Sequence, residues 1–469
     1  MQKRIEVQKI DHQLLWHPFT QRSSAFPPPV IVKARGIKLW DTEGHWYYDT
    51  ISSWWTSVHG HGHPALVRAV SRQIKRLDHV NFSGFTHPLA TELSRRLYLR
   101  LPQELSRFFY SDDGSTAVEA AIKLAFQYHA NTGNPQKTQF AHFENSYHGD
   151  TLGAVGVSGL DDFHAPFEKL KFSSYRLKAP VRPVPTTSCT LNPVGNPCPE
   201  DVWRDSETRL RAEADRTAAV IVEPLIQCVA GMLPYPAEYL KRLEKLCKEL
   251  NILVIYDEVA TGFGRTGTFF ALDQAGTVPD FLCLAKGLSG GVLPLALTVT
   301  TPQISSAFEG FPVRTFFHGH SYTANPIACA AALASLDIFE RKKVMEKAAP
   351  VRKLFHEILA SWCGHAGLGD VRFLGHIGAV DLISPLTRTS WDARLKAGQR
   401  VYRKSLEKGL VLRPLGDTIY WFLPLSVREK DLGIIMQRSL DVITGVMEEL
   451  SKEGPLDGNN TPSGSPRDV

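Results

Sequence analysis

Apolar positions in the middle of the chain follow two patterns, one typical of buried strands and one typical of amphipathic helices. Residues 219–222 form an unbroken apolar run, and so do residues 252–256 and 281–285. Between the first two runs, residues 239–250 carry leucines and a cysteine at helical spacing. Strand, helix and strand in this order predict a βαβ unit with a right-handed crossover and a mainly parallel sheet.

Charged residues follow two of these apolar runs. Asp257 ends the run in VIYDEVATGFGR, and Lys286 follows the run in FLCLAKGLSGG. Ligands of parallel sheets gather at the carboxyl ends of the strands. Burying a carboxylate is costly unless a partner compensates its charge. The sequence therefore predicts a ligand site at Asp257 and Lys286.

Lys286 has an ordinary interpretation, a solvated lysine at a strand end, and a chemical one. Between a buried strand and a glycine turn, desolvation lowers the pKa of a lysine and makes it a nucleophile toward aldehydes. Pyridoxal phosphate would form a Schiff base there, and Asp257 would keep a proton on its ring nitrogen. Alone, Asp257 would more often be a helix N-cap or a turn residue. The pair together favours the cofactor site.

A phosphate group also needs a binding site, and residues 108–129 (FFYSDDGSTAVEAAIKLAFQYH) predict a strand, a glycine turn and a helix. Gly114 and Ser115 open the helix, where the backbone N–H groups and the helix dipole favour an anion. Thr116 and Glu119 have capping-box spacing. The predicted apolar stripe consists of Val118, Ala121, Ile122, Ala125 and Phe126. A well-capped helix without a ligand is the alternative.

Two further segments carry candidate cofactor contacts. In HFENSYHGDT, Tyr147 follows a short strand and could stack on an aromatic ring, although a buried tyrosine is the simpler explanation. In FFHGHSYTANP, Gly319, His320 and Ser321 offer N–H and hydroxyl donors for a second phosphate contact. The three histidines of HGHGHP, residues 59–64, alternate with glycine and fit a turn better than a metal site.

Composition and charge exclude several classes of function. The chain has 469 residues, of which 43% are apolar and 22% charged, and its net charge is +5. These values are those of a soluble protein with a large domain and a smaller companion. The sequence has no block of five or more like charges and no uncharged apolar run of membrane-spanning length. We therefore expect neither a nucleic-acid nor a membrane partner.

The cysteines predict a reducing compartment. There are seven, an odd number, and no two have C-x-x-C spacing. The first residues, MQKRIEVQKIDHQLL, lack the apolar core of a secretory signal. We therefore expect no disulfide framework, no zinc site and a cytoplasmic protein.

Composition also predicts how the chain is divided. Residues 66–339 form the large domain, and residues 1–65 and 340–451 form a second mixed α/β unit that brackets it. Residues 173–207 hold six prolines between Pro180 and Pro199 and read as a long loop. Residues 452–469, rich in Gly, Pro, Ser and Asn, read as a disordered tail.

The motifs GST, SYHGD, DEVATGFGRTG, AKGLSGG and HGHSYTANP together resemble class III (ω-type) aminotransferases of pyridoxal phosphate fold type I. The resemblance covers residues 14–450. It implies an α/β fold, in which a large domain with a mainly parallel sheet is joined by a smaller α/β domain from the two chain ends. It also implies pyridoxal phosphate as cofactor, a homodimer and a ping-pong transfer of an amino group.

Three further stretches, LLWHPFTQ, SSWWTSVHGHGHP and RPLGDTIYWFLP, resemble motifs of the aminotransferases that convert 8-amino-7-oxononanoate to 7,8-diaminononanoate in biotin synthesis. Most of those enzymes use S-adenosylmethionine as amino donor and some use lysine, so both donors remain open. Other class III enzymes, acting on ornithine, 4-aminobutyrate or a polyamine, are alternatives. An aminomutase and a non-catalytic relative of the same fold are less favoured, the latter because Lys286 and Asp257 are both present.

The resemblance implies a role for each matching residue. Lys286 would be the Schiff-base lysine and proton carrier, Asp257 would hold the pyridinium, and Tyr147 would stack on the ring. The implied phosphate and pocket residues are Gly114, Ser115, Ser321 and Glu223, with Ser321 in a segment that crosses the dimer interface. The implied substrate-binding residues are Phe19, Trp54, Gly319, Arg413, Tyr420 and, with less support, Arg265.

Two positions depart from the pattern of that family. Many members have tyrosine at the position of Phe19, which lies near substrate. Many have Pro-Thr where this chain has His320 and Ser321. Serine keeps a hydroxyl, so we expect phosphate binding to survive.

Overall fold

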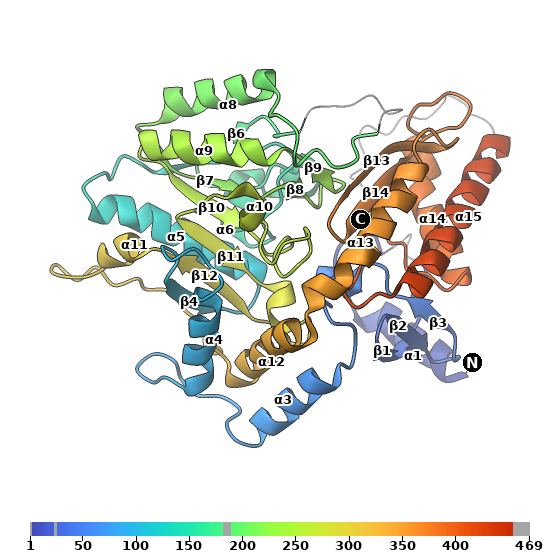
Figure 1. The fold of residues 1–469 in the computed structure, drawn as a ribbon, viewed down its shortest axis with the longest axis horizontal. Helices are drawn as coiled ribbons and strands as arrows, with labels where there is room; N and C mark the ends of the chain where they lie inside the picture. The colour runs from blue at the N-terminus through green and yellow to red at the C-terminus, as the bar shows by residue number, and fades with distance from the viewer. Residues whose placement is uncertain (1, 23–25, 182–188, 454–469) are drawn as a thin grey trace.

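A seven-stranded sheet forms the centre of the larger part of the molecule (Figure 1), and its strand order is β4-β12-β11-β10-β7-β5-β6. The computed structural model describes residues 2–22, 26–181 and 189–453. The strands are β4 Arg107–Ser111, β5 Gln139–Phe143, β6 Ser174–Leu177, β7 Thr217–Val222, β10 Leu253–Asp257, β11 Phe281–Leu284 and β12 Ala296–Thr300. Only β12 runs antiparallel to its neighbours, β11 and β4. The prediction of a mainly parallel sheet is confirmed.

Helices cover both faces of this sheet. They are α3 Pro64–Ile74, α4 Pro88–Tyr98, α5 Gly114–Asn131, α6 Leu152–Gly156, α7 Asp161–His164, α8 Glu200–Glu213, α9 Ala237–Glu249, α10 Leu272–Ala275, α11 Pro302–Ser306 and α12 Pro326–Lys342. In β7, Ala219 and Ile221 share a core with the apolar side of α5. Val220 and Val222 point the other way, into a core that includes the leucines of α9. Burial on both faces explains why the sequence of β7 is apolar without interruption.

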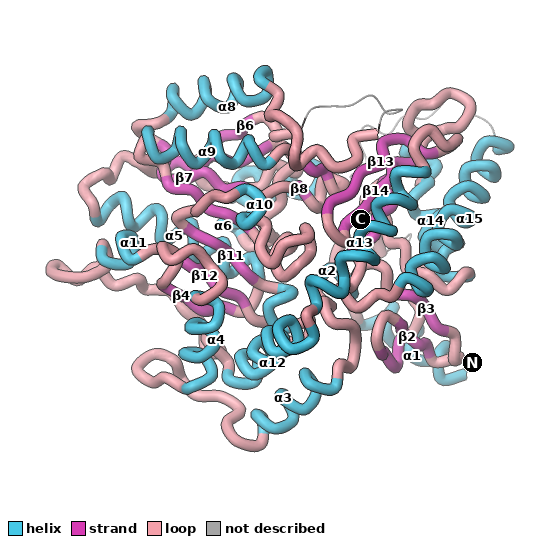
Figure 2. Tube along the Cα trace, viewed as in Figure 1, coloured by secondary structure: helices cyan, strands magenta, loops and turns pink. Residues whose placement is uncertain are grey.

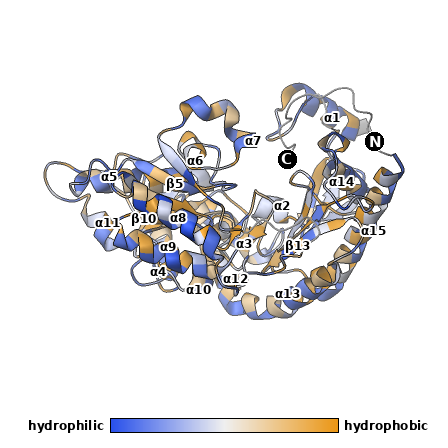
Figure 3. Cartoon of the chain, turned by 90° about the horizontal axis from the view of Figure 1, so that it is seen from above, coloured by the Kyte–Doolittle hydropathy of each residue, from blue (hydrophilic) through white to orange (hydrophobic). Residues whose placement is uncertain are grey.

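The smaller part of the molecule combines the two ends of the chain (Figures 1 and 2). Its elements are α1 Gln2–Leu14, β1 Ile31–Arg35, β2 Lys38–Asp41, β3 Trp46–Tyr48, α2 Ser52–Trp55, α13 Val344–Ser361, β13 Leu368–Leu374, β14 Ile377–Leu382, α14 Ala397–Glu407, β15 Thr418–Phe422 and α15 Glu429–Glu453. Tyr48 exchanges backbone hydrogen bonds with Gly409 and Val411, and the N–H of Phe422 donates to the carbonyl of Thr50. The surface helices α9 and α15 carry hydrophilic and hydrophobic residues along their length (Figure 3).

The proline-rich segment is not a single loop, contrary to the sequence prediction. It begins with β6 and ends inside α8, while residues 182–188 lie outside the described part of the chain. Leu191 pairs with β13 through two backbone hydrogen bonds, to Val371 and Phe373. Proline prevented the recognition of these elements from composition alone. Of the predicted disordered tail, Lys452 and Glu453 belong to α15, and the remaining residues lie outside the described ranges.

The expectation that the cysteines are free is wrong for one pair. Cys189 and Cys363 form a disulfide, with their Cα atoms 6.1 Å apart, and the other five are free and buried. Because the pair is 174 residues apart in sequence, no local spacing could have revealed it. Across the described ranges, none of the helices is both long enough and apolar enough to span a bilayer.

Candidate active site

A cavity of about 540 Å³ opens where β10 and β11 end. Asp257 is the last residue of β10, and Lys286 lies two positions beyond β11. The sequence-predicted residues that line the cavity are Phe19, Trp54, Gly114, Ser115, Tyr147, Glu223, Asp257 and Lys286. The fold therefore brings together residues that are far apart in the sequence, at the strand ends where ligands of α/β sheets bind.

The partner of Asp257 is His148. The Nδ1 atom of His148 lies 2.8 Å from Oδ2 of Asp257, and the N–H of Val259 donates to Oδ1 at 3.0 Å. Both side chains are buried, and both residues line the cavity. The sequence analysis assigned no role to His148, although its place beside Tyr147 in SYHGD was a signal. The carboxylate is compensated by the protein and still faces the cavity.

Lys286 opens a short 3-10 helix, Lys286–Ser289, and its backbone is left-handed, with a φ of 43°. A non-glycine residue in this conformation is strained, and such strain clusters at functional sites. The Nζ atom lies 4.9 Å from the centroid of the Trp55 ring. Desolvation by burial lowers the pKa of Lys286, although the nearby carboxylates of Asp257 and Glu223 oppose that shift. The amine therefore gains the neutral, nucleophilic form more easily than a surface lysine does.

The start of α5 forms one wall of the cavity. Its capping box joins Asp113 and Thr116, three residues earlier in the chain than the predicted Thr116 and Glu119. A Cβ atom on Gly114 would lie 2.5 Å from Cγ1 of Val259, and one on Gly149 would lie 2.0 Å from Oγ of Ser115. Both positions therefore require glycine, and the helix start presents its N–H groups at the cavity. Phe126, expected in the apolar stripe of this helix, is 46% exposed.

Glu223 connects two loops beside the site. Its carboxylate accepts hydrogen bonds from the N–H groups of Tyr147 at 3.0 Å and Cys228 at 2.9 Å. Burial raises the pKa of Glu223 to about 7. The hydroxyl of Tyr147 donates to Oδ2 of Asp150 at 2.7 Å, and its ring stacks on His164. These contacts fix the orientation of Tyr147 at the cavity wall.

The remaining wall is largely apolar. We define the apolar wall as Phe19, Trp54, Phe163, Val229 and Leu415, all of which line the cavity. The ring centroid of Phe19 lies 5.6 Å from that of Trp54 and 6.0 Å from that of Phe163. The guanidinium of Arg413 lies 4.3 Å from the centroid of the Trp54 ring, which places a positive charge beside this wall.

Trp54 and Trp55 both lie outside the strands. They belong to α2, a short segment in which both residues have left-handed backbones, with φ of 71° and 73°. Both line the cavity, but Trp54 is 37% exposed whereas Trp55 is buried against Phe422.

Two of the predicted substrate contacts, Arg265 and Tyr420, do not line the cavity of the single chain. Arg265 is buried and donates to Oγ of Ser52 and to the carbonyls of Trp55, Ser57 and Leu423, so its guanidinium holds backbone rather than facing the cavity. Tyr420 is also buried, and its hydroxyl accepts a hydrogen bond from Nε1 of Trp55. Both residues support the loops behind the cavity. Charge and motif position alone could not distinguish this role from substrate contact.

Gly319 and Ser321 lie outside the cavity lining of the single chain. The carbonyl of Ser321 accepts a hydrogen bond from Nε2 of His79 at 2.6 Å. His320 is closer to the site, because its Nε2 lies 2.8 Å from Oδ1 of the cavity residue Asp112.

The three histidines of the HGHGHP turn have separate structural partners. His59 contacts Oγ of Ser335, His61 contacts the carboxylate of Asp49, and His63 caps α3 by accepting the N–H of Ala65.

Comparison with known families agrees with this geometry. The model of the family "Aminotransferase class-III" matches residues 19–443. The chain belongs to the class-III aminotransferases. A relative from Nitratidesulfovibrio vulgaris is 41% identical over 94% of this chain and 82% of its own length, and one from Aquifex aeolicus is 40% identical over 95% and 98%. Both are named adenosylmethionine-8-amino-7-oxononanoate aminotransferase.

Solved structures of this aminotransferase class have the same fold. The adenosylmethionine-8-amino-7-oxononanoate aminotransferase of Methanocaldococcus jannaschii superposes with a TM-score of 0.87, at 36% identity, and the match covers 94% of this chain and 99% of that one. An amine transaminase from an uncultivated Pseudomonas species, solved in its pyridoxal phosphate-bound form, has a TM-score of 0.83 at 32% identity, covering 92% and 99%. The predicted fold type is confirmed.

Pyridoxal phosphate is the cofactor of this class, and the cavity fits it. The two glycines whose Cβ atoms would collide with neighbours leave space at the start of α5, as a phosphate requires. Asp257 offers a carboxylate and Lys286 an amine whose pKa is lowered. These groups match the three functional parts of the cofactor, its phosphate, its ring nitrogen and its aldehyde.

Proposed function

We propose that this aminotransferase converts 8-amino-7-oxononanoate to 7,8-diaminononanoate in biotin biosynthesis, with S-adenosylmethionine as amino donor. The observation that carries the proposal is the division of the cavity into a reactive side and an apolar wall. Lys286, Asp257 and Ser115 lie on the reactive side. The apolar wall, with Arg413 beside Trp54, suits a long aliphatic chain that ends in a carboxylate. The names of the full-length relatives support this choice of substrate.

Pyridoxal phosphate, when bound, supplies an aldehyde for the amine and a ring that stabilises negative charge on the reacting carbon. The N–H groups at the start of α5 and the hydroxyl of Ser115 would hold its phosphate. Asp257, fixed by His148 and by the N–H of Val259, would keep the ring nitrogen protonated. Tyr147 would lie against the ring. Glu223 would hold the loop that carries Tyr147.

Lys286 moves protons at its Nζ atom. Its lowered pKa lets the amine take a proton from the carbon of the donor and return one to the opposite carbon. The buried ring of Trp55 shields this exchange from water, and Trp54 and Phe19 line the cavity beside it. In the second half of the ping-pong reaction, the same atom works in the reverse direction on the keto substrate.

Arg413 would bind the substrate carboxylate, because a guanidinium forms paired hydrogen bonds with a carboxylate. Its position over Trp54 places the charge at the edge of the apolar wall. Phe19 would pack against the aliphatic part of the substrate. Because Phe19 has no hydroxyl, lysine is retained as the alternative donor to be tested.

We infer that the enzyme is a homodimer, in which Gly319 and Ser321 complete the site of the other subunit. Large apolar side chains are exposed around this segment, with Phe311 92%, Phe317 82% and Tyr322 64% accessible in the single chain. Exposed apolar clusters of this kind mark subunit interfaces. Sedimentation of wild type and Phe317→Asp tests this, and a monomeric wild type that retains full activity would contradict it.

We also infer that residues 1–65 and 340–451 form one domain, residues 66–339 the other, and that the enzyme is cytoplasmic. The backbone hydrogen bonds between Tyr48 and residues 409–411 support the first inference. Five of the seven cysteines are free and buried, which supports the second inference, whereas the Cys189–Cys363 disulfide opposes it. Limited proteolysis and cell fractionation test them separately.

A half-reaction tests the substrate without assuming the donor. The purified protein is converted to its pyridoxamine phosphate form, 8-amino-7-oxononanoate is added, and the visible absorbance of the pyridoxal form is followed. We expect the absorbance to return. If it returns only with another oxo compound, the substrate assignment is wrong while the class remains. The donor is then tested with S-adenosylmethionine against lysine.

A further inference from the structure

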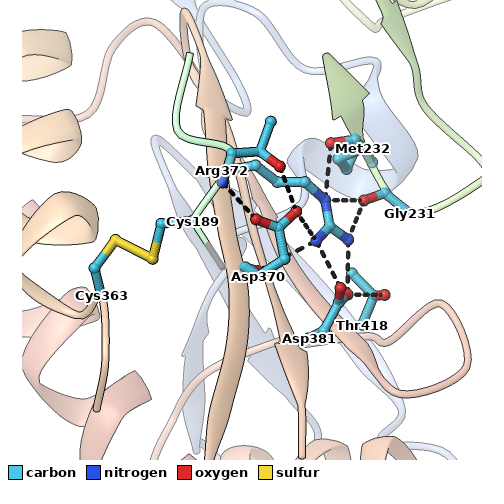
Figure 4. A network of polar contacts seen from close by, with 9 residues as sticks. Cys189, Gly231, Met232, Cys363, Asp370, Arg372, Asp381 and Thr418 are labelled. Atoms are coloured by element: carbon cyan, nitrogen blue, oxygen red, sulfur yellow. Dashed lines mark hydrogen bonds and ion pairs between the residues drawn. A yellow bond between two sulfur atoms is a disulfide. The ribbon is translucent and has the colours of Figure 1, made fainter. Parts of the chain in front are cut away.

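Arg372, in β13, is 2% exposed and is surrounded by oxygen atoms (Figure 4). Its Nε and Nη2 atoms donate to the carbonyl of Gly231 at 2.8 and 2.6 Å. Its Nη1 and Nη2 atoms pair with the carboxylate of Asp381 at 2.8 and 2.7 Å, and Nη1 also contacts Asp370 at 3.0 Å. A buried arginine with this many partners holds its neighbours in one geometry.

Each of the two groups of atoms that Arg372 joins leads to a different residue of the apolar wall, Val229 or Leu415. Gly231 lies in the turn that follows Val229, and Val229 is part of the apolar wall. On the other side, Asp381 accepts a hydrogen bond from Oγ1 of Thr418 at 2.7 Å. Thr418 exchanges two backbone hydrogen bonds with Leu415, which is also part of the apolar wall. Arg372 thus connects Val229 and Leu415, although it lines no part of the cavity itself.

The first of these connections continues to the reactive side. The N–H groups of Gly231 and Met232 both donate to the carbonyl of Cys228. The N–H of Cys228 in turn donates to Oε2 of Glu223 at 2.9 Å. Gly231 has a φ of 110°, and a Cβ atom there would lie 3.2 Å from Nη2 of Arg372, so the turn is fitted closely to the guanidinium. The second connection leads to the loop that carries Arg413, two residues before Leu415.

We propose that Arg372 is a positioning residue for substrate discrimination, which sets the distance between the turn carrying Val229 and the loop carrying Arg413 and Leu415. The proposal rests on the proposed function in one respect, since it assigns the apolar wall to the acceptor substrate. Arg372 acts through Gly231 on one loop and through Asp381 and Thr418 on the other. Its loss shifts the wall that meets the substrate chain and leaves Lys286 and Asp257 in place.

Asp370, which also contacts Arg372 but does not lead to the cavity, offers a control for the role of Asp381. The hydroxyl of Thr190 donates to Oδ2 of Asp370 at 2.9 Å, as that of Thr418 donates to Asp381 at 2.7 Å. Thr190 adjoins the disulfide residue Cys189, and it lies outside the cavity lining. Thr418→Val and Thr190→Val therefore each remove one threonine–aspartate hydrogen bond around Arg372. Only the first bond leads to the cavity.

The test compares the two variants as holoenzymes. We expect Thr418→Val to raise KM for 8-amino-7-oxononanoate about 2- to 10-fold, the effect of one hydrogen bond, with kcat and cofactor affinity unchanged. Thr190→Val should leave that KM unchanged. Both variants should lower the melting temperature, and by similar amounts, because each loses one hydrogen bond. Arg372→Lys keeps the charge, loses the paired contacts, and should raise KM further. Residues 413–418 should exchange amide hydrogens faster in Thr418→Val than in Thr190→Val.

Equal KM values in wild type, Thr418→Val and Arg372→Lys would overturn the proposal, as would equal KM changes in the two threonine variants. A loss confined to kcat would also overturn it, because the reactive side would then be the part disturbed. If wild type does not accept 8-amino-7-oxononanoate, the proposed function fails instead. Selectively faster exchange of residues 413–418 in Thr418→Val would still support the positioning role in that case.

Discussion

The Nδ1 atom of His148 lies 2.8 Å from Oδ2 of Asp257, and both side chains are buried at the wall of the cavity. The second carboxylate oxygen accepts the N–H of Val259, so each oxygen of Asp257 has a partner in the protein. A carboxylate fixed in this way can hold a ring nitrogen without rearrangement when a cofactor binds. Such preorganised charge contributes strongly to catalysis.

Substitution of Asp257 by Asn should lower kcat by about 10²- to 10³-fold, because the fixed negative charge is lost while the shape is kept. His148→Gln should have a smaller effect, since Asp257 retains its charge. The measurement is steady-state kinetics together with cofactor content. If Asp257→Asn retained full activity with bound cofactor, the role of Asp257 would have to be reassigned.

Lys286→Ala should abolish turnover. Borohydride should then no longer link the cofactor covalently to the chain at this position. The physical reason is the loss of the amine whose pKa burial lowers. Peptide mapping after reduction identifies the modified lysine. Exposed Lys353, which pairs with Glu357 on α13, provides the control, and Lys353→Ala should react like wild type. Turnover by Lys286→Ala would falsify the assignment.

Arg413→Lys should raise KM for the keto substrate about tenfold, because an ammonium cannot reproduce the paired contacts of a guanidinium. Arg413→Ala should raise it further, through the loss of both the charge and the packing on Trp54. Acceptors without a carboxylate should be equally good substrates of all three forms. A uniform loss with every acceptor would assign Arg413 a structural role.

Glu258 predicts a pH dependence of stability. Its buried carboxyl accepts the N–H groups of Ala271 and Leu272, both at 2.7 Å, and burial raises its pKa to about 8 from an ordinary 4.5. The folded state therefore holds this proton more tightly than the unfolded state does. The contribution of this protonated carboxyl to the free energy of unfolding is fully present below pH 4.5 and is lost as the pH rises through about 8.

The melting temperature should accordingly fall more steeply with rising pH in wild type than in Glu258→Gln. Exposed Glu104 serves as control, and Glu104→Gln should follow the wild-type curve. Parallel curves for wild type and Glu258→Gln would show that Glu258 is ionised throughout this range.

The disulfide between Cys189 and Cys363 predicts the number of free thiols and a contribution to the stability of the fold. Under denaturing, non-reducing conditions we expect five titratable thiols, since seven cysteines include one bonded pair. Closing a loop of 174 residues stabilises the fold by up to about 5 kcal/mol in the chain-entropy account. Cys189→Ser or a reductant should therefore lower the melting temperature. Seven reactive thiols would mean that the bond does not form in solution.

Much of the site was predictable because the relevant signals are local. The apolar run before Asp257, the glycine turn at Lys286 and the helix start at Gly114 each encode a strand end or a helix end in a few consecutive residues. Parallel sheets then place such ends at one edge. The right-handed crossover rule was sufficient to predict a shared cavity from them.

The sequence by itself determined the fold class and the family, and it predicted that Lys286, Asp257 and Tyr147 meet at one site, because these depend on patterns within short segments. Only the tertiary structure decided that His148 pairs with Asp257, that Arg265 donates to backbone carbonyls, that Tyr420 accepts a hydrogen bond from Trp55, and that Cys189 meets Cys363. Each of these depends on contacts between residues distant in the chain, which no local spacing specifies. The function of a buried charge is set by the partners that the folded chain brings to it.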